Sequence, residues 1–92
     1  MDKKEFNKTV GESLRAKRTE LGGATAGCKG SGVAVNIAKQ LGYGHQMSVY
    51  NLELGNTTVS FVDFMLYCRT LQMSTDEIAQ FSKEIIVKML KK

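Results

Sequence analysis

The stretch IAKQLGYGHQMSVYNLELGN, from Ile37 to Asn56, decides how this chain folds. Its first five residues place apolar side chains one and four positions apart, which is the spacing of a helix with one face on a core. The GYG segment that follows (42–44) interrupts the pattern, because glycine readily adopts the positive φ angles that stop a helix and turn the chain. The stretch therefore predicts a helix, a tight turn and a second helix.

The second helix is predicted to run from His45 to Leu54. Val49 and Leu52 have the spacing of an inward face, and Gly55 follows where a helix C-cap is expected. The side chains between them would point outward, and these are Gln46, Met47, Tyr50 and Asn51.

A small residue at Ala38, a glycine four positions later and a β-branched Val49 suit two helices that cross steeply. This block resembles the helix-turn-helix of the Cro/C1-type phage repressors and of the wider XRE family of regulators. The resemblance extends from Leu14 to Ile78 and is interrupted by a glycine-rich segment. It implies an all-α, lambda-repressor-like domain of five helices over residues 1–92, with a glycine-rich insertion between helices 1 and 2.

The other helices follow from apolar spacing. Helix 1 is predicted from Asp2 to Leu21, and helix 2 from Ser31 or Gly32. The segment that resembles the family's fourth helix has Val59 where the family usually has proline. Helix 1 would turn Phe6, Val10, Leu14 and Leu21 to the core, and helix 4 Phe61, Phe64, Met65, Cys68 and Leu71.

The last helix starts at a recognisable cap. Ser74 with Glu77 three residues later forms a capping box. An amphipathic face follows over residues 74–92 and consists of Ile78, Phe81, Ile85, Ile86, Met89 and Leu90.

The segment from Gly22 to Gly32 has five glycines in eleven residues, which predicts a flexible surface loop. Two functional alternatives remain open: a phosphate contact through Lys29, or a surface for a partner protein. Phage repressors often have a glutamine at the start of helix 2 whose side chain contacts a DNA phosphate. This chain has Val33 and Ala34 there, which cannot make that contact. The backbone N–H groups at the helix start near Ser31 would still be able to hold a phosphate.

The resemblance implies that the second helix of the motif reads DNA in the major groove. Gln46 and Asn51 are amides that suit adenine, and Met47 would lie against a thymine methyl group. The turn looks one residue longer than the family's, which shifts the predicted register by up to one residue. The remaining candidates for base or phosphate contact are His45, Ser48, Tyr50, Asn56, Thr57 and Thr58. An ordinary solvated helix face is the alternative interpretation.

The resemblance also implies an ion pair between helices. In these regulators an arginine of the first helix pairs with a glutamate near the end of the reading helix, and Arg18 and Glu53 match those positions. A buried pair of this kind orients elements more than it adds net stability.

The composition is compatible with a small DNA-binding domain, but many other small domains share it. The 92 residues carry a net charge of +4 and are 42% hydrophobic. Two cysteines without a CxxC spacing, and one histidine, predict no metal site, no catalytic nucleophile with its base and no cofactor. No signal peptide or membrane-spanning run is expected, so the predicted location is the cytoplasm.

The predicted function is therefore a transcriptional regulator, a repressor, that binds an operator in double-stranded DNA as a homodimer. The long apolar face of the last helix is the expected dimer surface, unless that helix folds back over helices 1 and 4. The alternative function is an antitoxin or protein-interaction module that keeps the DNA-binding domain and binds a partner through the same helix.

Overall fold

A computed structural model describes residues 2–22, 31–45 and 47–91, with the backbone alone for residues 22 and 31–35. This part of the chain forms five α-helices and no strand, so the predicted all-α class is confirmed. The helices are α1 (Lys3–Gly22), α2 (Ser31–Leu41), α3 (Met47–Glu53), α4 (Phe61–Thr70) and α5 (Thr75–Leu90).

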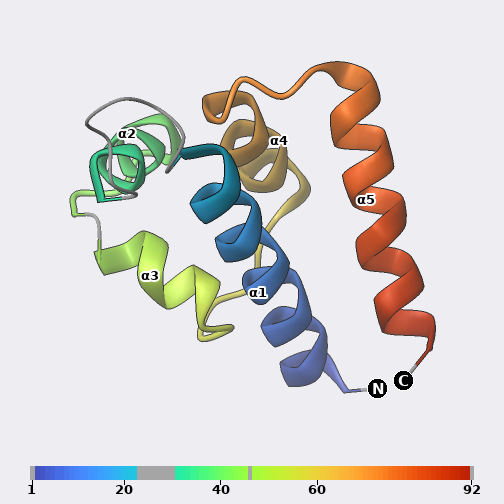
Figure 1. The fold of residues 1–92 in the computed structure, drawn as a ribbon. Coiled ribbons are helices and arrows are strands. Elements are labelled where there is room, and N and C mark those ends of the chain that lie inside the picture. Colours follow the sequence, from blue (N-terminus) through green and yellow to red (C-terminus); the bar gives the residue numbers. More distant parts are fainter. Residues whose placement is uncertain (1, 23–30, 46, 92) are drawn as a thin grey trace.

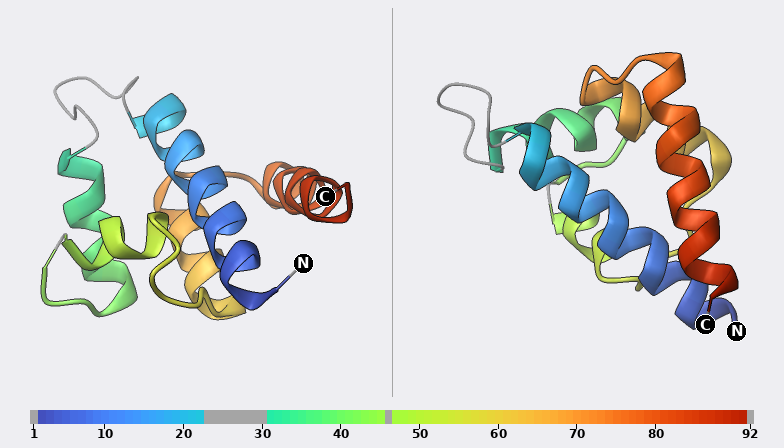
Figure 2. Two further views of the ribbon diagram at one scale, coloured as in Figure 1. Left: turned by 90° about the horizontal axis from the view of Figure 1, so that it is seen from below. Right: turned by 45° about the vertical axis from the view of Figure 1, so that its right-hand side comes forward.

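Helix α1 lies at the centre of the fold and packs against three of the other four helices. It contacts α2, α3 and α5, while α2 packs against α4 and α3. Helix α3 lies on one side of α1, and α5 lies on the other and runs antiparallel to it (Figures 1 and 2). The outer surfaces of α3 and α5 therefore face different directions and are free to serve different purposes.

Local chemistry sets most helix ends. Helices α2, α3 and α4 all end with a residue at positive φ, namely Gly42, Gly55 and Gln72. In each case the next residue donates its N–H to the carbonyl oxygen five positions back, as in the Schellman motif. Helix α5 begins with the predicted capping box: Ser74 Oγ accepts the Glu77 N–H, and Glu77 Oε1 accepts the Ser74 N–H.

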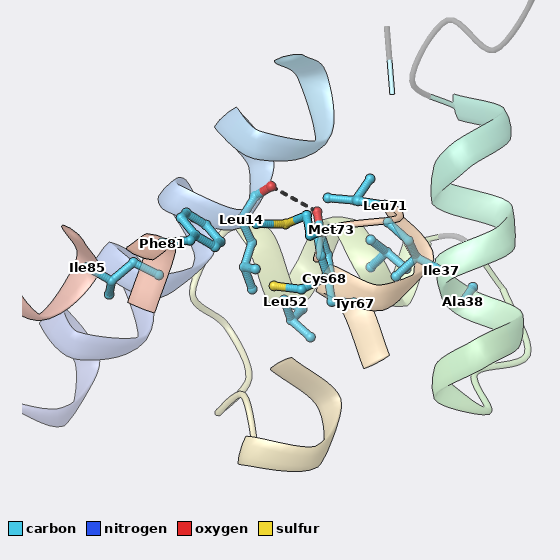
Figure 3. Packing of buried hydrophobic residues seen from close by; sticks show 11 residues of the cluster. Leu14, Ile37, Ala38, Leu52, Tyr67, Cys68, Leu71, Met73, Phe81 and Ile85 are labelled. Carbon is cyan, nitrogen blue, oxygen red and sulfur yellow. Dashed lines mark hydrogen bonds between the residues drawn. The ribbon is translucent and has the colours of Figure 1, made fainter. Parts of the chain in front are cut away.

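The core lies where α1, α2, α3 and α4 meet, and α5 closes it from the far side of α1 (Figure 3). Leu14, Ile37 and Leu52 are fully buried at its centre. Phe81 brings α5 into contact, since its ring stacks on Phe64 of α4 with centroids 5.8 Å apart. The remaining buried apolar residues are Ala38, Val49, Tyr67, Cys68, Leu71, Met73 and Ile85.

The predicted inward face of α4 is wrong in part. Phe61 is 77% exposed and Met65 is exposed, whereas Tyr67 is fully buried. Relative to the predicted orientation, α4 is rotated about its axis so that Tyr67 points inward. The Tyr67 hydroxyl donates to acceptors inside the protein, so the large ring is buried without leaving its polar atom unpaired. Tyr67 was not among the inward residues that the apolar spacing predicted.

Three further expectations are corrected. Phe6, expected in the core, is 38% exposed near the start of α1. The reading helix is shorter than the predicted range from His45 to Leu54, since α3 spans Met47–Glu53. Gly22 belongs to α1 rather than to the predicted loop, whereas α2 begins at Ser31, one of its two predicted starts. Residues 23–30 of that loop lie outside the described residues.

The last helix folds back, as one of the two sequence-based interpretations proposed. Helix α5 packs along α1 and buries Phe81 and Ile85, so the amphipathic face as a whole is not available for a second subunit. Ile86 and Leu90 from the same predicted face stay outside, at 53% and 81% exposure. Only this outer part of α5 remains open to a partner.

Cys68 is a core residue. Burial raises the pKa of its thiol to about 11, although the positive charge of Lys17 acts in the opposite direction. Cys68 is free, and its thiol is protonated near neutral pH and unreactive. Among the described residues no helix has the length and apolar character to cross a membrane.

Candidate nucleic-acid interface

Helix α3 has one buried side and one exposed side. Val49 and Leu52 have no exposed surface, and Glu53 is 3% exposed. On the opposite side Met47 is 53% exposed and Asn51 is also exposed. The inward positions were predicted correctly. Of the candidate reading residues on the described part of this helix, Met47 and Asn51 face solvent, whereas Ser48 and Tyr50 are only partly exposed.

The turn between α2 and α3 places this helix. Gly42 has φ +80°, and the Tyr43 N–H donates to the carbonyl oxygen of Ala38 at 2.8 Å. His45 then acts as a cap, because its Nδ1 accepts the Met47 N–H at 3.1 Å. A ring nitrogen accepts a hydrogen bond only when it carries no proton, so this bond is made through an unprotonated Nδ1.

The ion pair expected between Arg18 and Glu53 is present and is bidentate. Arg18 Nε lies 2.7 Å from Glu53 Oε2, and a second guanidinium nitrogen lies 2.9 Å from Oε1. The side chains are only 8% and 2% exposed. The hydrogen bond to Glu53 raises the pKa of Arg18, against the effect of burial, so the guanidinium stays charged.

Tyr67 completes this pair as a third member. Its hydroxyl lies 2.5 Å from Glu53 Oε2 and 3.1 Å from the carbonyl oxygen of Leu14, so its single proton is shared between two acceptors. Burial, followed by the charge of Glu53, raises the pKa of Tyr67 far above its ordinary value and keeps the hydroxyl protonated. Through Glu53, α3 is thus bonded to both α1 and α4.

Tyr50 takes part in the same cluster. Its ring centroid lies 5.5 Å from Cζ of Arg18, within the range of a cation–π contact. The side chain is partly buried. Tyr50, which was expected to point outward, therefore supports the position of α3 and is only partly exposed.

Two glycines let α1 approach the C-terminal end of α3 closely. A Cβ on Gly11 would lie 2.6 Å from the carbonyl oxygen of Leu52, and one on Gly55 would lie 2.7 Å from Cα of Lys8. The segment after Gly55 lies beside the start of α1, where Asn7 Nδ2 donates to Thr58 Oγ1 at 3.2 Å. The end of α3 is thereby held against the first turns of α1.

The other predicted site residues have the following places. Asn56, Thr57 and Thr58 are exposed just after α3, His45 is exposed before it, and Ser48 is half-buried in its first turn. Ser31 is the first residue of α2. Lys29 and Gln46 lie outside the described residues.

Sequence patterns missed three positions that the tertiary structure brings to this site. Tyr67 fixes the carboxylate of Glu53, and Gly11 sets the approach of α1. Lys8, whose backbone touches Gly55, brings an exposed cation to the end of α3. None of them carries a local signal of its own, because each acts through a residue far away in the chain.

Positive charge follows the side of α1 that faces α3. Lys4, Lys8 and Arg15 are exposed and lie seven before, three before and four after Gly11, so they share its helical stripe. Four of the nine Asp and Glu residues of the chain line a groove between α1 and α5 together with Lys17, namely Glu20, Asp76, Glu77 and Glu84. Glu5 and Glu12 are exposed on α1 itself.

Within the part of the chain that the structure describes, no group of three or more histidine, cysteine or acidic side chains is placed to hold a metal ion.

Comparisons of this chain with protein-family models, curated proteins and solved structures find no match.

Proposed function

We propose that this chain is a sequence-specific double-stranded DNA-binding regulator of the Cro/C1 type, in which α2 and α3 act as a helix-turn-helix and α3 reads the major groove. The observation that carries the proposal is the charge of α3. Between His45 and Thr58 the sequence contains a single formally charged residue, Glu53, which is buried against Arg18. The exposed side of α3 thus presents no carboxylate to repel a phosphate backbone.

Groove chemistry gives the exposed residues their roles. A helix fits the major groove, where base pairs differ in their pattern of donors, acceptors and methyl groups. Asn51 suits a bidentate contact with adenine N6 and N7, and Met47 suits a thymine methyl group. Asn56 and Thr57, past the C-terminal end of α3, suit phosphate contacts that set the register without reading sequence.

The basic stripe of α1 supplies the electrostatic part of the proposal. Lys4, Lys8 and Arg15 border α3, whereas the acidic groove opens between α1 and α5. This asymmetry orients the molecule with α3 towards DNA and the acidic groove away from it. Each cation that neutralises a phosphate adds affinity that falls as salt rises.

The proposal includes a second copy of the chain. Helix α3 has seven residues, a length of roughly 10 Å at 1.5 Å per residue, which covers about three base pairs. So short a site is too frequent in any genome to be recognised alone. A homodimer on a two-fold symmetric operator doubles the sequence that is read, with half-sites about 34–36 Å apart.

Substitution of Asn51 by alanine tests this assignment. We expect Asn51→Ala to weaken binding to a selected duplex by about 1–3 kcal/mol and to leave binding to a scrambled duplex nearly unchanged. Fluorescence anisotropy titrations with both duplexes at one salt concentration give the two affinities.

Two variants make the comparison specific. Asn36→Ala removes the same exposed amide from α2, on the side that faces α4, and is expected to change neither affinity. Lys8→Ala is expected to weaken binding to both duplexes alike and to reduce the salt dependence. An Asn51→Ala protein with an unchanged ratio of the two affinities would rule out Asn51 as a base-reading residue.

A further inference from the structure

A polar groove of about 520 Å³ lies between α2 and α4. Its described lining residues come from these two helices and from the turn after α4, namely Asn36, Gln40, Leu66, Arg69, Thr70 and Gln72. Three of them carry an amide, one a hydroxyl and one a guanidinium, and none of the six carries a carboxylate. The volume is within the range of about 300–1,000 Å³ that is typical of small-molecule sites. None of these residues belongs to α3 or to the basic stripe of α1, so the groove is distinct from the proposed DNA interface.

Helical spacing places the polar groups on two walls of the groove. Asn36 and Gln40 are four positions apart on α2, so their side chains are neighbours on one side of that helix. Leu66, Arg69 and Thr70 have the corresponding spacing on α4, which packs against α2. The Thr70 hydroxyl donates to the carbonyl oxygen of Leu66 at 2.7 Å, so it can only accept a bond from a ligand. One wall therefore offers two amides, and the other offers a cation, an acceptor and an apolar side chain.

The charged and amide groups of the groove are not used by the fold. Within the described part of the chain, Arg69 forms no ion pair and no side-chain hydrogen bond. In that same part, the amide side chains of Asn36, Gln40 and Gln72 form no hydrogen bond either. All four residues are exposed, whereas Leu66 and Thr70 are half-buried. The donors and acceptors are therefore available to a ligand that displaces water from the groove.

Gln72 has a backbone conformation that is unfavourable for its residue type. Its φ is +62°, and it is the one residue other than glycine with a positive φ among those that the structure describes. Glycine adopts this conformation without a steric penalty, and Gly42 and Gly55 occupy the equivalent positions after α2 and α3. Side chains held in such conformations cluster at ligand-binding sites. The glutamine in place of a glycine points to a use for its amide in the groove.

We propose that the polar groove binds an adenine mononucleotide, with the phosphate on Arg69 and the base between Leu66 and the amides of α2. A guanidinium matches the geometry of a phosphate with two parallel N–H bonds. Asparagine and glutamine amides suit N6 and N7 of adenine, and Leu66 provides an apolar contact for the face of the ring. The absence of a carboxylate from the described lining leaves nothing there to repel the phosphate.

Arg69 also has a structural role, which differs from phosphate binding in what it requires. It lies in the last turn of α4, where a positive charge offsets the negative end of the helix dipole. Lysine would supply the same charge but not a planar pair of donors. Arg69→Lys therefore keeps the interaction with the helix dipole and loses the bidentate contact with phosphate.

A chemical-shift titration of the isotope-labelled full chain with adenosine monophosphate, in the absence of DNA, tests the proposal. The side-chain amide resonances of Asn36, Gln40 and Gln72 are expected to shift with one common dissociation constant, while that of Asn51 stays in place. Arg69→Gln and Arg69→Lys should each weaken binding by about tenfold or more, because a bidentate, charge-assisted contact is lost. Adenosine and ribose 5-phosphate, which each lack one half of the nucleotide, should also bind at least about tenfold more weakly.

Lys83→Gln is the matched control. Lys83 is exposed on α5 and does not line the groove, so loss of its charge should leave the affinity within about twofold of wild type. Gln72→Gly should weaken binding by about threefold or more and at the same time raise the midpoint of thermal unfolding. A glutamine with a purely structural role would not give these opposite changes.

A chain whose resonances do not shift up to millimolar nucleotide would overturn the proposal. So would shifts confined to α3 or to the basic stripe of α1, or Arg69 variants that bind as tightly as wild type. Equal losses from Arg69→Gln and Lys83→Gln, or adenosine that binds as tightly as the nucleotide, would overturn it as well. None of these outcomes involves DNA, so they are distinct from a failure of the proposed function.

Discussion

Replacement of Glu53 by alanine should destabilise the protein by about 3–5 kcal/mol, the range found when one partner of a buried ion pair is removed. The variant loses both hydrogen bonds from Arg18 and the one from Tyr67. It also leaves the guanidinium of Arg18 buried without its carboxylate. Urea unfolding followed by circular dichroism at 222 nm measures the free energy of unfolding.

A glutamate of α1 provides the control for this substitution. Glu20 pairs with Lys17 at 3.6 Å, but its side chain is 65% exposed. Glu20→Ala should therefore cost no more than about 1 kcal/mol, as for other surface pairs. Equal losses from Glu53→Ala and Glu20→Ala would show that burial of the pair with Tyr67 does not matter for stability.

Replacement of Gly11 by alanine should destabilise the protein by about 1–3 kcal/mol, although helix propensity alone predicts a gain of about 1 kcal/mol. The new Cβ would meet the carbonyl oxygens of Leu52 and Glu53, which are backbone atoms and cannot move aside by a change of rotamer. Helix α1 and the end of α3 would have to separate. The sign of the change in the free energy of unfolding decides between local propensity and tertiary packing.

Gly44→Ala is the matched control for Gly11→Ala. No heavy atom lies within 4 Å of the Cβ position on Gly44, and its φ is not in the left-handed region. Alanine there should be neutral or stabilising by about 0.4–1 kcal/mol, because it restricts the unfolded chain. If Gly11→Ala stabilised the protein as well, α1 and α3 would not be in the close contact described above.

The sequence predicted those features that local chemistry determines. Gly42 and Gly55 end their helices through positive φ angles, and the Ser74–Glu77 box starts α5. Such signals involve residues within a few positions of each other, so they are legible without a structure. The inward residues of α3, Val49 and Leu52, were also correct because a single helical period fixes them.

Features that depend on distant partners were missed or misplaced. The rotation of α4 depends on Tyr67, whose burial requires a carboxylate 14 residues earlier in the chain. Gly11 has no side chain and gives no apolar signal, so its close contact with the end of α3 is visible only in the folded chain. The outward position of Asn51 was legible, but the periodicity of a helix does not distinguish a base-reading amide from a solvated one.

Selection of binding sites from a pool of random duplex DNA tests the central claim most directly. The full wild-type chain is incubated with the pool at fixed salt, and bound duplexes are amplified and sequenced over several rounds. We expect enrichment of an inverted repeat whose half-sites are centred about one helical turn, or a multiple of it, apart. A pool that stays random while the protein remains folded would contradict sequence-specific reading by α3.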